Sequence, residues 1–305
     1  MTGKLIAVAN MKGGVGKTTT VVSLAEALAA DNPNASILVV DLDPQASASV
    51  CLAGNDLLAE MIAKDRTLEA FLDLRLIARV SAKLAPRIRE AVSRTTQGGN
   101  QLKISLLPCG PDLRVVEREI IYSLNARRFN MRGVEGQTWK LFEQEFQPLG
   151  KTYDNVIFDC PPGISPLSEV AIRASDLVIV PTIPDFISVY GINGLLRVFW
   201  RATKGALPPP KLKPHVLVTM FQRSFKQHKL KVEELERAAN TKDSRILLLK
   251  TKVQHAAALA GAMRNIDEAP TLNQKHLTFI QKYRGDVTEV LNQLVQELKG
   301  VLHAN

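Results

Sequence analysis

Residues 11–19 read Met11-Lys12-Gly13-Gly14-Val15-Gly16-Lys17-Thr18-Thr19, a glycine-rich run that closes in Gly-Lys-Thr-Thr. The apolar run before it, Leu5 to Ala9, predicts a buried strand. The apolar residues after it, from Val21 to Leu28, recur at helical spacing and predict a helix. Glycines between a strand and a helix let the backbone turn tightly and approach a ligand without a Cβ in the way. This arrangement is typical of a phosphate-binding loop.

The residue types in the loop match the chemistry of a bound nucleoside triphosphate. The first turn of the following helix offers unpaired N–H groups to an anion. Lys17 is placed to reach the β- and γ-phosphates, and the Thr18 hydroxyl to ligate Mg²⁺. A loop that only turns the chain is the alternative, but the strand, the helix and the Gly-Lys-Thr ending together disfavour it. We therefore expect the nucleotide to contact Gly13, Gly14, Val15, Gly16, Lys17, Thr18 and Thr19.

Two further apolar runs end in carboxylates. Residues 37–40 lead into Asp41-Leu42-Asp43-Pro44-Gln45, and residues 155–158 lead into Asp159, with prolines after both. Proline stops a central strand, so these acids are expected at strand ends, where open α/β sheets place their ligand crevice. Asp159 is expected to hold Mg²⁺ together with Thr18. For Asp41 and Asp43 the alternative is a set of turn and cap contacts.

The rest of the chain repeats the pattern of buried strands separated by helical segments. Apolar runs at 103–108, 177–181, 215–220 and 245–249 predict four more strands. Helical crossovers between them imply an α/β fold: a doubly wound, mostly parallel sheet with helices on both faces. We expect a single domain over residues 1–305, with a helical insertion around residues 57–100.

Composition narrows the class of protein. The chain has 305 residues, of which 46% are hydrophobic and 23% charged, as in soluble globular proteins. No run approaches the roughly 18 apolar residues of a membrane span. We expect no signal peptide, because the N-terminus leads directly into a strand. Cys51, Cys109 and Cys160 match no zinc spacing, and reduced thiols in a cytoplasmic protein are the simplest interpretation.

The net charge of +9 is concentrated in one stretch. No Asp or Glu lies between Asp185 and Glu233, a span that holds nine Lys and Arg residues. A field of one sign favours a polyanionic partner, unless acids from elsewhere in the fold neutralise it. A second basic set, which would share one helix flank, is a candidate polyanion surface, although a solvated face is the simpler interpretation; its members are Arg75, Arg79, Lys83 and Arg87.

The paired lysines of the loop resemble the deviant Walker A motif of the ParA/MinD family of ATPases. Asp41-Leu42-Asp43-Pro44-Gln45 is similar to the Asp-x-Asp-Pro-Gln segment of the ParA branch, and Asp159-Cys160-Pro161-Pro162-Gly163 to the switch II of the family. Family members often carry Gln where this chain has Met11. The resemblance implies a P-loop NTPase-like fold, with ATP and Mg²⁺ as ligands.

The resemblance also implies roles for individual residues. The catalytic set is Lys12, acting across a dimer interface on the nucleotide of the partner, Lys17 at the phosphates, and Asp43 orienting the attacking water. Thr219 and Met220 sit where relatives often have a residue near the adenine base. Arg223 resembles an arginine that relatives use for DNA, and its basic neighbours complete the expected DNA-binding set: Arg197, Arg201, Arg223, Lys226 and Lys229.

The function so implied is an ATPase with slow, partner-stimulated turnover that dimerises with ATP and binds DNA non-specifically on the nucleoid. With a ParB-like adaptor it would drive partition of a plasmid, a chromosome region or another cargo. The alternative is a MinD-like membrane-associated ATPase, but the last apolar stripe, from Val287 to Leu302, carries acids on its polar side and favours core packing. A nitrogenase iron protein would need cluster-bridging cysteines, which three scattered cysteines do not supply.

Overall fold

A seven-stranded parallel sheet forms the centre of the molecule. The computed structural model describes residues 3–128, 130–200, 207–254, 271–272, 275 and 287–303. The strand order is β5-β2-β6-β1-β7-β8-β9, and all neighbouring strands in this sheet are parallel. The predicted α/β fold with a parallel sheet is thereby confirmed. The strands are β1 (Lys4–Val8), β2 (Ile37–Asp41), β5 (Ile104–Leu107), β6 (Asn155–Asp159), β7 (Leu177–Thr182), β8 (His215–Phe221) and β9 (Leu247–Gln254).

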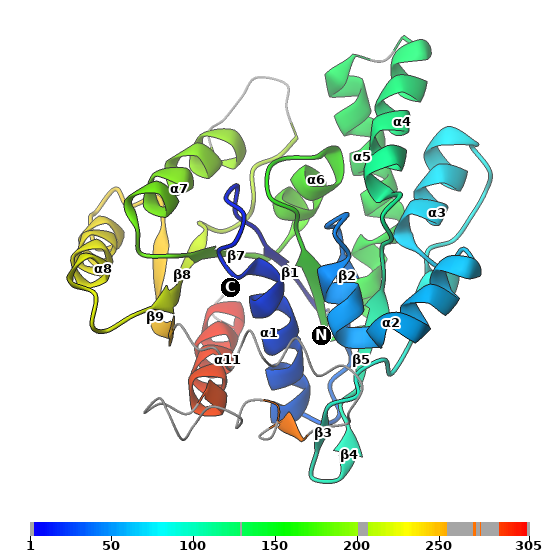
Figure 1. Cartoon of the computed structure of the whole chain (residues 1–305). Coiled ribbons are helices and arrows are strands. Elements are labelled where there is room, and N and C mark those ends of the chain that lie inside the picture. The colour runs from blue at the N-terminus through cyan, green and yellow to red at the C-terminus, as the bar shows by residue number, and fades with distance from the viewer. Residues whose placement is uncertain are drawn as a thin grey trace.

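Helices cover both faces of this sheet, and successive residues of a strand enter different cores. Leu5 and Ala7 of β1 pack in one core, whereas Ile6 and Val8 pack in the other. The second core includes α1 and α11, which lie side by side (Figure 1). The α-helices that the structure describes are α1 (Lys17–Asp31), α2 (Ser47–Ala63), α3 (Leu68–Leu72), α4 (Leu113–Ala126), α5 (Met131–Glu145), α6 (Pro166–Ala174), α7 (Phe186–Phe199), α8 (Lys226–Ala239) and α11 (Val287–His303).

The register of the central strands brings the three sequence motifs together at the carboxyl ends of the strands. This side of the sheet is called the carboxyl edge, and the side formed by the amino ends of the strands is called the amino edge. Val8 of β1 lies opposite Asp159 of β6, and Asp41 of β2 lies opposite Asp159 on the other side. The glycine loop follows β1 directly. Because all these strands run in the same direction, their carboxyl ends meet, and the edge has the position at which open α/β sheets bind ligands.

The basic set from Arg75 to Arg87 does not lie on one helix, so the prediction of a shared helix flank is wrong. A π-helical turn, Asp73–Ile77, ends the helical run, and Arg79 adopts a left-handed conformation with φ 60° that an α-helix does not accommodate. Three of the four side chains have acidic or aromatic neighbours. Arg75 and Lys83 approach Glu145, at 3.9 and 3.7 Å, and the Arg87 guanidinium lies 5.6 Å from the centre of the Phe71 ring.

Two other segments differ in detail from the prediction. A short hairpin, β3 (Thr96–Gln97) with β4 (Asn100–Gln101), lies at the end of the segment expected as a helical insertion around residues 57–100. Strand β9 begins at Leu247 and continues through Thr251-Lys252-Val253, which the sequence placed beyond the strand. The packing of the last helix is as predicted, because Leu291, Leu294, Val295 and Leu298 of α11 are buried.

The acid in the middle of α11 has a structural partner. Carboxylate oxygens of Glu297 accept hydrogen bonds from the backbone N–H groups of Lys250 and Thr251, at 2.6 and 3.0 Å, and from the Thr251 hydroxyl at 2.9 Å. Backbone groups on an outer strand need partners outside the ladder. Glu297 therefore joins the last helix to β9, the strand at one end of the sheet.

Candidate functional site

The loop between β1 and α1 has the backbone shape of an anion cradle. Gly14 and Gly16 adopt left-handed conformations, with φ 71° and 86°, which side chains with a Cβ rarely adopt. Gly16 immediately precedes α1 and provides no side-chain cap, and the first turn of α1 contains no acid. The N–H groups of that turn are thus left for a ligand, as expected for a phosphate site.

Two buried side chains, Asn10 and Thr219, hold the loop in place. The Asn10 amide donates to the Pro181 carbonyl at 2.7 Å and accepts from the Lys12 N–H at 3.0 Å. The Thr219 hydroxyl donates to the Val15 carbonyl at 2.8 Å. These bonds tie both parts of the loop to the ends of β7 and β8. A single sequence gives no signal for them, because the partners are about 170 and 200 residues apart.

Lys17 is buried at the base of the loop. Its ammonium donates to the Lys12 carbonyl at 3.0 Å, and the residue is 7% exposed. Burial lowers the pKa of Lys17, although the nearby carboxylates of Asp159 and Asp43 oppose that shift. The lysine is therefore within the cradle and faces the two acids that the sequence placed at strand ends.

Thr18 and Asp159 form the pair that the sequence predicted for Mg²⁺. The Thr18 hydroxyl donates to Asp159 Oδ2 at 2.7 Å, and Asp159 Oδ1 is buried without a hydrogen-bond partner among the described residues. Burial, and then the Asp41 carboxylate, raise the pKa of Asp159 well above its usual value. A buried carboxylate oxygen with no partner, beside a hydroxyl and a phosphate cradle, fits a hydrated Mg²⁺ ion. No cluster of three or more His, Cys, Asp or Glu side chains suited to a metal occurs in the described part of the chain.

Asp41 and Asp43 have different surroundings. Asp41 Oδ2 accepts from the Ser49 N–H and hydroxyl, at 2.8 and 2.7 Å, and so ties the first turn of α2 to the end of β2. Burial raises the pKa of Asp41 to about 6. Asp43 Oδ1 accepts from the Gln45 N–H at 3.0 Å. Both aspartates therefore make the turn and cap contacts of the alternative, and Asp43 in addition lies near Lys17 at the loop.

The side chain of Lys12 has partners of its own in this single chain. Its ammonium lies 3.1 Å from Asp185 Oδ2 and 2.9 Å from the Ser188 hydroxyl, at the start of α7. Neither partner was predicted from the sequence. The spacing Asp185-x-x-Ser188 is a signal for a helix cap, but it contains nothing that points to Lys12.

Met220 lies beside the loop. Its φ is 50°, and its Cε atom is 3.9 Å from the position that a Cβ on Gly16 would take. A half-buried thioether next to the glycine loop is compatible with contact to the base or sugar of a nucleotide.

The expected DNA-binding residues occupy two exposed segments. Arg223, Lys226 and Lys229 lie in the turn after β8 and in the first turn of α8, and Arg197 lies in the last turn of α7; all four are exposed. Arg201 lies outside the described residues. Acids neutralise part of the stretch, because Lys211 pairs with Asp176 and Lys231 with Glu234, both at 2.7 Å.

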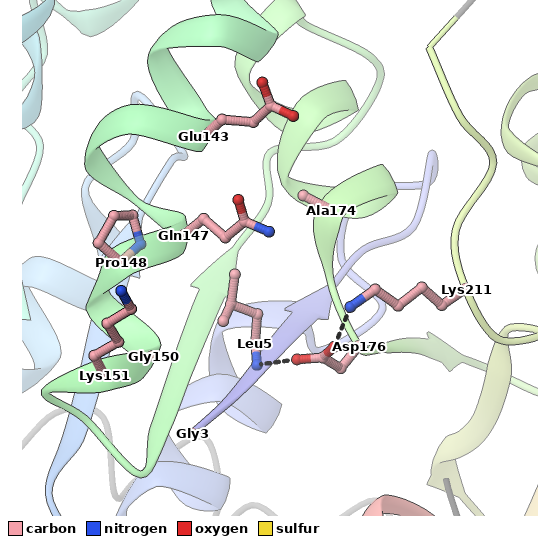
Figure 2. A pocket seen from close by; sticks show the side chains of 10 residues that line it. All are labelled: Gly3, Leu5, Glu143, Gln147, Pro148, Gly150, Lys151, Ala174, Asp176 and Lys211. Atoms are coloured by element: carbon pink, nitrogen blue, oxygen red, sulfur yellow. Dashed lines mark hydrogen bonds and ion pairs between the residues drawn. The ribbon is translucent and has the colours of Figure 1, made fainter. Parts of the chain in front are cut away.

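A hollow of about 420 Å³ lies at the opposite, amino-terminal edge of the sheet (Figure 2). Asp176 holds one of its walls, with Oδ2 accepting from the Leu5 N–H at 2.9 Å and Oδ1 paired with Lys211. Glu143, Gln147 and Lys151 contribute polar side chains to its rim. None of the residues that the sequence predicted for nucleotide, metal or DNA lines this hollow.

The cysteines are separate free thiols. Cys109 and Cys160 are buried and Cys51 is half-buried. Burial raises the pKa of all three, that of Cys51 to about 11. Among the helices that the structure describes, none has the length and apolar character to cross a membrane.

Comparison with known proteins finds a matching family model and relatives in sequence. A family model described as an AAA domain matches residues 3–207. The chain is 30% identical over 220 residues to the chromosome partitioning protein ParA of Myxococcus xanthus, covering 72% of this chain but only 65% of that protein. It is 32% identical over 216 residues to the chromosome-partitioning ATPase Soj of Thermus thermophilus, covering 71% of this chain and 69% of that protein.

Two solved structures share the fold. A plasmid partition protein of Borrelia burgdorferi bound to AMPPNP superposes with a TM-score of 0.62 at 18% identity, over 98% of this chain and 99% of that one. Cobyrinic acid a,c-diamide synthase from Mycobacterium smegmatis, with a bound ATP analogue and magnesium, gives a TM-score of 0.65 at 21% identity, over 97% and 94% of the two chains.

Proposed function

Because the chain belongs to the AAA-domain family and, within it, to the ParA-type ATPases of the ParA/MinD family, we propose that it is a partition ATPase that hydrolyses ATP. One observation carries the proposal: the Thr18–Asp159 contact, with its partnerless buried oxygen, beside an uncapped glycine loop. A buried carboxylate oxygen without a hydrogen-bond partner is costly for a fold. A site for Mg²⁺ and a triphosphate accounts for it.

The residues of the site have separate tasks in the proposed reaction. Lys17 and the loop N–H groups bind the β- and γ-phosphates, and Thr18 and Asp159 hold Mg²⁺, directly or through water. Bound Mg²⁺ neutralises the charge that develops on the phosphate oxygens. Asp43 orients a water molecule for attack on the γ-phosphorus. The bond from that phosphorus to the β,γ-bridging oxygen then breaks, leaving ADP and phosphate.

Turnover in this proposal depends on a second copy of the chain. Lys12 supplies positive charge to the nucleotide of the partner, a role similar to that of an arginine finger, which is worth about 10³ to 10⁵ in rate. A subunit alone lacks that charge and is slow. The ATP-bound dimer binds DNA without sequence preference on the nucleoid of the cytoplasm, and a ParB-like adaptor stimulates hydrolysis to move a plasmid, a chromosome region or another cargo.

DNA binding is proposed for the exposed cations that follow β8. Arg223, Lys226 and Lys229 have no ion-pair partner within the described part of the chain, in contrast to Lys211 and Lys231 of the same stretch. Unpaired cations are available to phosphates, and phosphate contacts carry no sequence information. Three cations without an ion pair among the described residues therefore lie together around the start of α8.

The test combines ATP-dependent ATPase activity with DNA binding over a series of salt concentrations. Arg223→Glu with Lys226→Glu is expected to weaken binding of random duplex DNA strongly and to lower the log–log salt slope by about 0.9 for each DNA phosphate that the variant no longer neutralises. Lys211→Glu is the matched control, since Lys211 already pairs with Asp176. An unchanged slope in the double variant, with intact dimerisation, would contradict the proposed surface. Co-sedimentation of the wild-type protein with liposomes and ATP would favour the membrane alternative instead.

A further inference from the structure

The ammonium of Lys12 is bound within its own chain. It contacts Asp185 Oδ2 at 3.1 Å and the Ser188 hydroxyl at 2.9 Å. The side chains of Lys12 and Asp185 are 32% and 36% exposed, so water reaches the pair. Ion pairs with this exposure contribute little to stability, up to about a factor of five in an equilibrium. The contact is therefore strong enough to orient Lys12 and weak enough to be exchanged for another.

The two oxygens of Asp185 have different roles. Oδ1 accepts from the Ser188 N–H at 2.6 Å and caps α7, while Oδ2 binds Lys12. Partial burial raises the pKa of Asp185, but the hydrogen bonds from Ser188 and Lys12 outweigh it and lower the pKa overall. The carboxylate is thus charged at neutral pH. Asparagine in its place would keep the cap and remove the charge.

Helix α7 lies against the glycine loop beyond this ion pair. A Cβ on Gly191 would be 4.0 Å from Asn10 Oδ1, and one on Gly194 would be 3.4 Å from Met11 Sδ. Residues three apart share a helix face, so the two glycines bring α7 close to the residues just before Lys12. The start of α7 and the start of the loop form one packed unit, and Asp185 and Ser188 are the polar part of its contact.

We propose that Asp185 and Ser188 are positioning residues that hold Lys12 in the free subunit and release it when a second copy of the chain presents its nucleotide. This inference rests on the proposed role of Lys12 in trans. In the free subunit the carboxylate occupies the ammonium that the phosphates of the partner would otherwise attract. On dimerisation, each Lys12 ammonium leaves the Asp185 carboxylate and binds the triphosphate of the other subunit. Two ion pairs must therefore break for each dimer that forms, and this cost opposes dimerisation.

The first experiment measures the contact in the nucleotide-free protein. An N-hydroxysuccinimide ester should acetylate Lys12 several-fold faster in Asp185→Asn than in the wild type, because the amine is no longer held by a carboxylate. Lys64, which pairs with Glu60 elsewhere, is the internal control, and its rate should not change. Equal acetylation rates of Lys12 in the two proteins would overturn the inference, whatever the fate of the proposed function.

The second experiment measures dimerisation with a slowly hydrolysed ATP analogue by sedimentation velocity. Asp185→Asn should tighten the ATP-dependent dimer by about 4- to 25-fold, which is the factor of two to five for one exposed ion pair applied twice. Ser188→Ala should act in the same direction with a smaller effect. Thermal unfolding of Asp185→Asn close to that of the wild type will show that the cap of α7 persists.

A double-mutant cycle separates the inference from the proposed function. In a Lys12→Ala background, Asp185→Asn should no longer alter dimerisation, because there is no ammonium to release. The same effect in both backgrounds would overturn the positioning role. If Lys12→Ala alone dimerises and hydrolyses ATP as the wild type does, the trans role itself fails, and this outcome is distinct from a failure of the cycle.

Discussion

The carboxyl edge and the amino edge of the parallel sheet both carry aspartates and lysines, but these groups differ in burial and in their hydrogen-bond partners. At the carboxyl edge Asp41 and Asp159 are fully buried, adjacent in register, and have raised pKa values. At the amino edge Asp176 is half-buried, and its two oxygens are satisfied by the Leu5 N–H and by Lys211 (Figure 2). At the carboxyl edge, ionisation of the buried carboxylates is therefore unfavourable without a ligand. At the amino edge, the acid has only a structural role.

The largest expected difference between the edges concerns ATP affinity. Lys17→Ala should lower the affinity for Mg·ATP by about 100-fold or more, because no other side chain of the loop replaces its charge at the phosphates. Lys211→Ala, at the opposite edge, is the control and should leave the affinity unchanged. Titration calorimetry measures both. Near-normal affinity in Lys17→Ala would disprove the assignment of the loop.

The next effect separates binding from turnover within the carboxyl edge. Asp43→Ala should retain ATP affinity within about three-fold and reduce the hydrolysis rate by about 100-fold, since it removes an interaction made mainly in the transition state. Single-turnover phosphate release, with ATP affinity measured in parallel, checks it. A parental hydrolysis rate would remove Asp43 from the mechanism and leave it as a turn residue bound to Gln45.

A smaller effect concerns stability and pH at the same edge. Burial raises the pKa of Asp41 from 3.8 to about 6, and that of Asp159 rises as well. The folded state therefore binds protons more tightly than the unfolded state. The stability from these protons is fully present below about pH 4 and is lost as the pH rises to about 6 and beyond, at about 1.4 kcal/mol per pKa unit.

Asp159→Asn tests this cost directly. Without nucleotide and Mg²⁺ it should unfold at a temperature a few degrees higher than the wild type at pH 7.5, with a smaller difference at pH 5, because the amide does not ionise. Differential scanning calorimetry at the two pH values measures the change. If the wild type were more stable than Asp159→Asn at pH 7.5 without ligand, the claim that ionised Asp159 destabilises the carboxyl edge would be contradicted.

The smallest effects are expected at the amino edge. Asp176→Ala leaves the Leu5 N–H without its acceptor and should cost about 1–2 kcal/mol of unfolding free energy. Lys211→Met breaks only an ion pair whose lysine is 64% exposed and should cost less than about 1 kcal/mol. Urea denaturation resolves the order. Loss of ATP affinity in either variant, with the fold intact, would show that the edges are coupled.

Local sequence pattern sufficed to place the glycine loop between a strand and a helix, the acids at strand ends and the buried last helix. These features depend on neighbours within a few residues: glycines before a helix, an acid after an apolar run, and a stripe at helical spacing. The prediction that the basic set from Arg75 to Arg87 shares one helix flank was wrong. Regular spacing in the sequence does not reveal that Arg79 has a left-handed backbone conformation.

Tertiary structure alone brought Lys12 to Asp185 and Ser188, Thr219 to Val15, and Asp176 to Leu5. The partners in these contacts are more than 170 residues apart in the chain. No periodicity links them, because they meet only when the order of β6, β1, β7 and β8 sets which strand ends are neighbours. Residue type and local spacing therefore place the chemistry at strand ends, and the order of parallel strands selects which of those groups touch.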